Sequence, residues 1–373
     1  MKLNVGITGQ EGFVGQHLYN TLGLFPYEFE IVEYHSDFFK NPPQLTEFVG
    51  KCDIIVHLAA MNRHPDPEVL YKTNVELVEK LVEALEKSKS KAHVLFSSSS
   101  QEEQDNLYGK SKREGRQLLE RWSKNAGGKF TGLLMPNIFG PFGKPYYNSF
   151  IATFCYQLTH NEQPEIMQDA SVKLIYVSDL IKLILNEIRC GMGHELHHIS
   201  HSDEYKVSEI LSLLECFKNE YLVLGVIPKL NNSFELNLFN TFRSYIDFKT
   251  HYPVNYVKNS DARGSFVEVI RLNIGGQVSF SMTKPGITRG NHFHTRKIER
   301  FAVIKGKALV KLRRVGYEEI LAFYLDGDEP AFLDMPIWYA HNIQNIGDDD
   351  LYMNFWINEF YDPNDPDTYS EAV

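Results

Sequence analysis

The chain has 373 residues, of which 43% are hydrophobic and 23% are charged, as in ordinary soluble globular proteins. That length favours two domains. A net charge of −10 at pH 7 argues against a nucleic-acid-binding surface, and no apolar run reaches the roughly 20 residues that a membrane-spanning helix needs. The amino terminus enters a strand pattern without a secretory signal, and the 4 cysteines lack metal or redox spacing, so we expect a cytoplasmic protein.

The chain opens with an apolar segment that leads into three evenly spaced glycines. Residues 2–8 predict a buried strand, residues 9–15 read Gly-Gln-Glu-Gly-Phe-Val-Gly, and a helical pattern follows up to Leu24. Glycines at a strand-to-helix turn let the backbone approach a pyrophosphate, which the free N–H groups of the helix amino terminus then bind. The spacing therefore predicts a dinucleotide site.

The end of the second predicted strand, residues 29–35, bears on the choice between NAD and NADP. An acidic residue facing the ribose would favour NAD and repel the 2′-phosphate of NADP. Glu33 is available for that role, whereas a turn at His35 and Ser36 would tolerate the phosphate. The residues alone leave both interpretations open.

The stretch from Ser97 to Lys112 combines a cluster of hydroxyl groups with a Tyr-x-x-x-Lys pair. The serines follow an apolar run, so they stand at the carboxyl end of a predicted strand, where sites in open α/β sheets lie. Tyr108 and Lys112 share one face if the chain is helical from Leu107 onward. Because a neighbouring ammonium favours tyrosinate, we expect Lys112 to lower the pKa of Tyr108 and so make it a proton donor.

Strand and helix patterns continue to alternate up to about residue 224. Further strands are expected at 52–60 and 130–134, and helices at 66–87, 148–157, 176–188 and 206–217. The helix at 66–87 contains Asn74, for which a functional role and a packing role are both open. A turn-rich break and an aromatic-rich segment follow, and we place the domain boundary there, which gives domains 1–243 and 244–373.

These motifs, in this order, resemble the extended short-chain dehydrogenase/reductase family, whose members act on nucleotide sugars. The resemblance rests on the glycine triplet, His-Leu-Ala-Ala at 57–60, the serine cluster, the Tyr-x-x-x-Lys pair and Pro-Asn-Ile-Phe-Gly-Pro at 136–141. It implies a doubly wound parallel sheet of the Rossmann type. It also implies that Ser99, with Ser98 as its nearest competitor, hydrogen-bonds the substrate carbonyl.

By the same resemblance Tyr108 is the acid/base, and Lys112 tunes it and holds the nicotinamide ribose. Asn137 is implied as a substrate-binding residue. The implied cofactor-binding set is Gly9, Gly12, Phe13, Val14, Gly15, His35, Leu58, Ala59, Tyr108, Lys112 and Pro136.

From residue 254 the chain reads as short alternating strands separated by Gly, Asp and Pro, which is typical of an all-β barrel or sandwich. Residues two apart on a strand share a face, so His292 and His294 point the same way and Glu299 can face them from the returning strand. Three imidazoles and one carboxylate suit zinc, and the resemblance described next implies His341 as the third imidazole. The strands are expected at 265–272, 277–283, 299–304, 308–313, 319–324, 331–334 and 351–357.

The spacing Gly-x5-His-x-His-x4-Glu-x6-Gly over residues 286–306 resembles the first motif of the cupin superfamily. The second motif lies at 336–341, with Asn345 four residues on and Trp338 where glycine is usual. The alternative is a metal-free cupin, since some sugar 3,5-epimerases of this superfamily use a His–Asp pair and no metal.

Together the two domains resemble the CapF type of bifunctional capsule-biosynthesis enzyme, including the closing segment 358–367. This implies that the cupin domain epimerises C3 of a UDP-2-acetamido-4-keto-6-deoxyhexose. It implies further that the first domain reduces the C4 ketone with NADPH to UDP-2-acetamido-2,6-dideoxy-L-talose, in a homodimer. One ketone would then serve both sites, because it acidifies the C3 hydrogen and also accepts the hydride.

Two other classes of function remain open. The first domain could be a redox-neutral epimerase or dehydratase that retains its nicotinamide. Dehydratases of this superfamily need an acidic pair near the tyrosine, and Glu102, Glu103 and Asp105 lie close in sequence. Alternatively, the cupin domain could be a dimerisation or sugar-sensing module without chemistry of its own.

Overall fold

The computed structural model describes residues 2–193, 196–262 and 264–373, and the chain forms two compact units. The first contains the residues up to Phe150 together with Gln168–Val207, and the second contains Ile151–Met167 together with Ser208–Val373. The boundary predicted at residues 243 and 244 falls inside the second unit. As a boundary between independently folding domains it stays a prediction.

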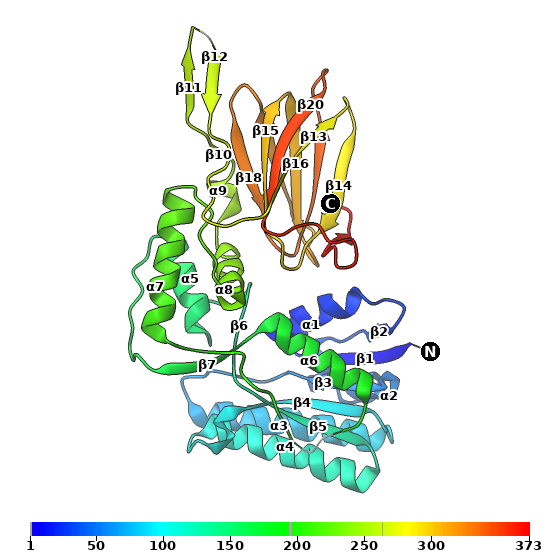
Figure 1. Cartoon of the computed structure of the whole chain (residues 1–373). Coiled ribbons are helices and arrows are strands. Elements are labelled where there is room, and N and C mark those ends of the chain that lie inside the picture. The colour runs from blue at the N-terminus through cyan, green and yellow to red at the C-terminus, as the bar shows by residue number, and fades with distance from the viewer. Residues whose placement is uncertain (1, 194–195, 263) are drawn as a thin grey trace. The chain divides into compact units, whose positions relative to one another are not determined.

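The first unit is built on a parallel sheet with the strand order β2-β1-β3-β4-β5-β8 (Figure 1). The sheet grows outward on both sides of the β1–β3 pair, so ligands are expected beyond the carboxyl ends of these two strands. The strands are β1 (Leu3–Thr8), β2 (Phe29–Val32), β3 (Ile54–His57), β4 (His93–Ser99), β5 (Lys129–Met135) and β8 (His197–His198).

Helices cover both faces of this sheet. On one face α1 (Phe13–Gly23) and α6 (Val177–Cys190) pack against the apolar side chains of the strands, and on the other α2 (Pro42–Lys51), α3 (Pro67–Lys87) and α4 (Leu107–Ala126) do so. The strands are therefore buried on both sides, which explains their continuous apolar runs. The predicted doubly wound Rossmann-type sheet is confirmed.

Three strand predictions in this unit are wrong at their ends, and one of them is β3, which covers Ile54–His57 instead of residues 52–60. β2 stops at Val32 instead of residue 35, and 3-10 turn η1 (Ser36–Lys40) follows. β4 runs on through the first three serines to Ser99, because each pairs with β5, and 3-10 turn η2 (Ser100–Glu103) comes next. A smaller sheet contains β6 (Asn137–Phe139), β7 (Ser171–Tyr176) and β9 (Asp203–Lys206).

The second unit contains two antiparallel sheets, in the orders β10-β18-β15-β20-β13 and β17-β16-β19-β14-β21. Figure 1 labels every strand of the first of these sheets. The predicted all-β barrel after the Rossmann-type domain is confirmed. A separate hairpin is formed by β11 (Lys258–Asp261) and β12 (Gly264–Val267). The remaining strands are β10 (Val254–Asn255), β13 (Gln277–Thr283), β14 (Thr288–Phe293), β15 (Glu299–Lys305), β16 (Lys307–Arg314), β17 (Ile320–Asp326), β18 (Ala331–Met335), β19 (Tyr339–Asn345), β20 (Leu351–Ile357) and β21 (Tyr369–Ser370).

The second unit also contains helical segments that precede the barrel in sequence. A buried polar network joins them to the barrel. Arg300 on β15 donates to both carboxylate oxygens of Asp334 on β18 at 2.8 and 2.9 Å, and Tyr221 donates to the same carboxylate at 2.5 Å. Arg243 donates to the Met335 carbonyl at 2.9 Å. The segments are α5 (Phe150–Thr159), α7 (Val207–Phe217), π-helical turn η3 (Lys218–Val223), α8 (Ser233–Arg243) and α9 (Phe248–His251).

This network predicts a large loss of stability when its carboxylate is removed. Asp334 is 0% exposed and Arg300 1%, so Asp334→Ala leaves buried guanidinium groups without a counter-charge. We expect urea denaturation to show a loss of about 3–5 kcal/mol in the free energy of unfolding. Glu319→Ala, which removes the exposed partner of Lys249, is the control and should leave the midpoint unchanged. Equal midpoints for the two variants would contradict the prediction.

Among the residues that the structure describes, no helix combines the length and apolar character needed to cross a membrane.

Candidate functional sites

The glycine turn between β1 and α1 lies against the segment that follows β3. Gly9 has φ +74°, and a Cβ placed on it would lie 2.7 Å from the Ala59 nitrogen and 2.9 Å from the Leu58 carbonyl carbon. Only glycine allows this approach, so three predicted cofactor residues from two strands meet at the sheet's switch point. Gly12 is the N-cap of α1 and donates its N–H to the Gly9 carbonyl at 3.0 Å.

The other predicted cofactor and substrate residues have these surroundings. Phe13 packs edge-on against the ring of His17, with centroids 5.4 Å apart, and Val14 packs against the apolar core. His35 is exposed and its Nε2 lies 3.1 Å from the Glu33 carboxylate. Gly15 lies in α1, Pro136 lies between β5 and β6, and Asn137 donates to the Lys173 carbonyl at 3.3 Å. Their roles toward cofactor and substrate stay predictions.

The serine cluster and the Tyr108 helix lie side by side because of one glycine. A Cβ on Gly109 would lie 2.0 Å from the Gln101 carbonyl, so only glycine lets η2 pack this closely on α4. Ser98 is buried and donates to the Glu102 carboxylate. Ser99 is half-buried, and its Oγ accepts from the Gln101 N–H at 3.2 Å. Of the two candidate serines, Ser99 therefore retains a hydroxyl proton to donate to a ligand.

Tyr108 and Lys112 share one side of α4, but their polar groups contact different partners. The Lys112 ammonium donates to the Ser97 carbonyl at 2.9 Å and lies 5.8 Å from the centroid of the Tyr108 ring. The Tyr108 hydroxyl instead donates to Asn62 Oδ1 at 3.2 Å. The ammonium thus contacts the backbone of β4 and lies over the phenol ring, whereas the phenol oxygen is hydrogen-bonded to Asn62.

The prediction that Lys112 lowers the pKa of Tyr108 is wrong for this structure. Burial, with a smaller contribution from Tyr147, raises the pKa of Tyr108 to about 12. Burial likewise lowers the pKa of Lys112 to about 8, opposed in part by Glu102. The loss of hydration outweighs an ammonium that faces a carbonyl group. Tyr108 is therefore a protonated acid at neutral pH, the form that can donate a proton.

The contact to Tyr108 depends on Asn62, for which the sequence predicts no role, and on Asn74, for which a functional role and a packing role were both open. Asn74 is buried on α3, where its Oδ1 accepts from the Met61 N–H at 2.7 Å and its Nδ2 donates to Ser111 on α4 at 3.2 Å. It thereby holds the segment after β3, with Asn62, against α4. The position of Asn62 just beyond a buried strand is the one sequence signal for it.

The acidic residues considered for a dehydratase have other partners. Glu102 is buried in an ion pair with Arg116, at 3.0 Å between Oε2 and Nη2. Asp105 pairs with Lys110 at 2.7 Å, and Glu103 is exposed. The contacts of these acidic residues therefore support a dehydratase less well than a reductase.

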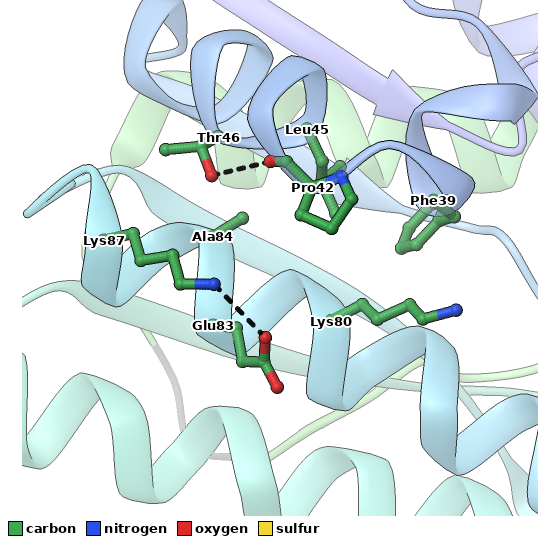
Figure 2. A pocket seen from close by; sticks show the side chains of 8 residues that line it. All are labelled: Phe39, Pro42, Leu45, Thr46, Lys80, Glu83, Ala84 and Lys87. Atoms are coloured by element: carbon green, nitrogen blue, oxygen red, sulfur yellow. Dashed lines mark hydrogen bonds and ion pairs between the residues drawn. The ribbon is translucent and has the colours of Figure 1, made fainter.

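A hollow on the first unit is lined by residues of η1, α2 and α3 (Figure 2). Glu83 and Lys87 form an ion pair at 3.5 Å on its α3 side. None of the predicted site residues is among those that line it, which are Phe39, Pro42, Leu45, Thr46, Lys80, Glu83, Ala84 and Lys87. The hollow therefore gives no information about the reaction.

The four predicted metal ligands of the second unit meet inside the barrel. One nitrogen or oxygen from each of His292, His294, Glu299 and His341 lies within 4.8 Å of those of the other three. β14 and β19 bring His292 opposite His341 in the strand register. Glu299 Oε2 lies 3.1 Å from His294 Nε2 and 3.4 Å from His341 Nε2.

The surroundings of this cluster fit a divalent metal. His294 Nδ1 lies 2.5 Å from the Asp367 carbonyl and His341 Nδ1 3.1 Å from the Tyr339 carbonyl. A carbonyl only accepts, so both rings carry a proton on Nδ1, which leaves Nε2, the nitrogen nearer Glu299, as the one that could bind a metal. Burial lowers the pKa of His292 to about 4, so its ring is neutral, as a metal ligand must be.

In the turn before His341, Trp338 stands where the predicted motif usually has glycine and adopts a backbone conformation that favours glycine. Trp338 has φ +62°, the left-handed region that favours glycine. The backbone N–H of Trp338 donates to the His294 carbonyl at 2.7 Å, and the indole ring stacks on Phe293 with centroids 5.4 Å apart. Asn345, the last residue of the motif, is buried and donates to the Thr283 and Asp349 carbonyls, both at 2.8 Å. It holds the end of β19 and is not a ligand candidate.

The chain is similar to known proteins along its full length. Residues 5–190 match the NAD dependent epimerase/dehydratase family, and residues 259–369 match the polysaccharide biosynthesis C-terminal domain. The UDP-2-acetamido-2,6-beta-L-arabino-hexul-4-ose reductase of Pseudomonas aeruginosa is 30% identical over 378 residues, which cover 100% of this chain and 99% of that protein.

Two further relatives support the assignment. The spore coat polysaccharide biosynthesis protein SpsL of Bacillus subtilis is 29% identical over 121 residues, 30% of this chain and 80% of its own length. The crystal structure of the capsular polysaccharide assembling protein CapF from Staphylococcus aureus is 37% identical, with a TM-score of 0.64 and 100% of both chains covered. This chain therefore belongs to the CapF family, in which a domain of the epimerase/dehydratase type precedes a polysaccharide-biosynthesis C-terminal domain.

Proposed function

We propose that this chain is a bifunctional nucleotide-sugar enzyme. Its barrel epimerises C3 of a UDP-2-acetamido-4-keto-6-deoxyhexose, and its first unit reduces the C4 ketone with NADPH to UDP-2-acetamido-2,6-dideoxy-L-talose. The full-length likeness to a hexul-4-ose reductase and to CapF supports this proposal. The observation that carries it is that one chain has both a half-buried, protonated tyrosine near a serine and a lysine and a cluster of side chains that could bind a metal.

The first unit has the groups that ketone reduction requires. A nicotinamide supplies the hydride when bound. Ser99 would donate a hydrogen bond to the C4 carbonyl oxygen, and Tyr108 would give its phenolic proton to that oxygen as it becomes an alkoxide. Lys112 would bind the ribose hydroxyls and stabilise the tyrosinate that remains. In the free enzyme, Asn62 Oδ1 holds the phenol by accepting a hydrogen bond from its hydroxyl at 3.2 Å.

For the cofactor we propose NADP(H), with His35 beside its 2′-phosphate. Glu33, the acidic residue that directly follows β2, lies 3.1 Å from the His35 ring. That contact reduces the ability of the carboxylate to hold a ribose diol, and a protonated His35 would attract a phosphate. The homodimer and the cytoplasmic location also stay predictions.

The barrel has the groups for proton exchange next to a ketone. His292, His294, Glu299 and His341 would hold a divalent metal such as zinc, which supplies a Lewis acid for a developing enolate. Four protein ligands complete a tetrahedral zinc, and a metal held by all four would be structural. A catalytic role needs a fifth coordination position or the departure of one ligand.

Incubation in heavy water tests the proposal against its alternatives. With the 4-keto substrate and no NADPH, the intact chain should introduce deuterium at C3 without reducing the ketone, because enolate formation needs no hydride. Addition of NADPH should then yield the alcohol with deuterium at C3. Mass spectrometry and NMR measure both products. Reduction without C3 exchange would point to a non-catalytic barrel, and turnover without consumption of NADPH would point to the redox-neutral class.

A further inference from the structure

The C-terminal segment after β20 packs against the turn that carries the metal-ligand candidates. Tyr369 and Ser370 form β21, which pairs with β14 so that Ser370 lies opposite His292. The ring of Tyr369 stacks on Phe293 with centroids 5.3 Å apart. The closing segment is therefore part of the wall of the site, although it lies far from the metal motif in sequence.

Asp367 is the centre of this contact and is 2% exposed. Its carboxylate accepts hydrogen bonds from the backbone N–H groups of Thr295, Arg296 and Lys297, each at 3.0 Å. It also accepts one from the Thr295 hydroxyl at 2.6 Å. Three consecutive N–H groups around one carboxylate fix the course of the backbone between His294 and β15. A single side chain thus determines the conformation of the turn that joins two ligand candidates.

The main chain of the same residue contacts a ligand candidate directly. The carbonyl of Asp367 accepts the Nδ1–H of His294 at 2.5 Å. Asp367 has φ +40°, a conformation that non-glycine residues seldom adopt and that the surrounding contacts must maintain. It lets one residue present its side chain to the turn and its carbonyl to the imidazole.

We propose that Asp367 is a positioning residue for the metal centre: it fixes the tautomer and direction of the His294 ring. The inference rests on the proposed metal site. A carbonyl that accepts the Nδ1–H favours the tautomer whose Nε2 can bind a metal, and the carboxylate holds that carbonyl in place through the turn. Outer partners of this kind orient metal-bound histidines and raise their basicity.

Neighbouring contacts secure the segment without reaching His294. Arg296 donates to Glu359 and to Asp365, both at 3.0 Å, and Lys297 Nζ donates to the Pro366 carbonyl at 2.5 Å. The Asp365 side chain is 69% exposed. It is thus a matched control, since it lies on the same segment, carries the same charge and binds the same turn, but has no contact with His294.

The experiment compares the zinc affinity of the full chain in three forms, by competition with a chromophoric chelator. Asp367→Ala should bind zinc about 10–100-fold more weakly than the wild type. Asp365→Ala should bind it within about twofold of the wild type, because exposed ion pairs contribute little. In the metal-free proteins, ¹⁵N NMR should show His294 protonated on Nδ1 in the wild type and in Asp365→Ala. A mixture of tautomers is expected in Asp367→Ala.

The outcomes separate the two hypotheses. A wild type that binds no zinc would overturn the metal site, and this inference with it. A wild type that binds zinc beside an equally tight Asp367→Ala would overturn only the role of Asp367, as would equal losses in both variants. If Asp367→Ala does not fold, Asp367→Asn replaces it, since an amide keeps the shape and one accepting oxygen. The asparagine variant should still lose affinity and the fixed tautomer, and wild-type values for both would overturn the proposal.

Discussion

Replacement of Tyr108 by phenylalanine is expected to lower the rate of ketone reduction by about 10²–10⁴-fold, the usual contribution of a positioned proton donor. The change removes one hydroxyl from a half-buried ring, so the fold and the cofactor pocket should be retained. Single-turnover reduction of the epimerised 4-keto sugar, followed by NADPH absorbance, measures the loss. NADPH binding, measured by fluorescence titration, should be unchanged.

Tyr71→Phe is the matched control for this variant. Tyr71 lies on α3, and its hydroxyl donates to Glu114 on α4, away from Asn62 and the serine cluster. The Tyr71→Phe substitution therefore removes a hydrogen-bonded phenolic hydroxyl from the same pair of helices and should leave the reduction rate unchanged. A loss of only two- or threefold in Tyr108→Phe would rule out the tyrosine as the proton donor.

The same site predicts the sign of the pH dependence of reduction. With a pKa raised to about 12, Tyr108 stays protonated across the working range and gives no titration of its own there. With a pKa lowered to about 8, Lys112 loses its positive charge as the pH rises through that value. The kcat/KM for reduction, which reports the free enzyme, should thus fall above pH 8. Lys112→Met should be slower at all pH values and should lack this step.

Replacement of Glu299 by glutamine is the second change with a large expected effect. It removes the only carboxylate of the cluster while keeping its volume, so the barrel's interior loses its single negative ligand. We expect the zinc content to fall from close to one ion per chain, and the affinity to weaken by more than the ~10–100-fold typical of outer-shell changes. C3 exchange in heavy water should be lost with the metal.

Two controls show whether the effect of Glu299→Gln is specific to the metal-ligand candidates. Glu318→Gln changes an exposed carboxylate on the same barrel and should leave the zinc content and C3 exchange unchanged. Glu299→Gln should still reduce an already epimerised 4-keto sugar at the wild-type rate, because the candidate groups for reduction lie in the first unit. A wild-type protein that is folded and active in exchange but free of metal would refute the metal centre.

Much of both candidate sites could be predicted from sequence because their spacing is short. The glycine triplet, the Tyr-x-x-x-Lys pair and the His-x-His pair each lie within one or two elements. The periodicity of a helix or a strand there determines which side chains share a face. The structure indeed brings the four metal-ligand candidates within 4.8 Å of one another and places Ser99 and Tyr108 on adjoining elements.

Contacts between residues far apart in the chain could not be predicted from such local spacing. Asn62 and Tyr108 are 46 residues apart, and His294 and Asp367 are 73 apart, yet each pair forms a hydrogen bond. No local period relates such positions. The pKa of Tyr108 likewise depends on distant parts of the chain. The spacing between Tyr108 and Lys112 suggested a lowered pKa, whereas burial of Tyr108 by the rest of the unit raises it.

The sequence by itself determined the class of each domain and the residue types of each candidate site, because apolar periods and turn residues act over a few positions. Only the tertiary structure decided which polar groups face those residues and where one compact unit ends. Arg243, placed by sequence in the first domain, packs beside Tyr221 and donates to the Met335 carbonyl of the second unit. Burial excludes water from such groups, and the partner that replaces the water is set by the folding of distant segments against one another.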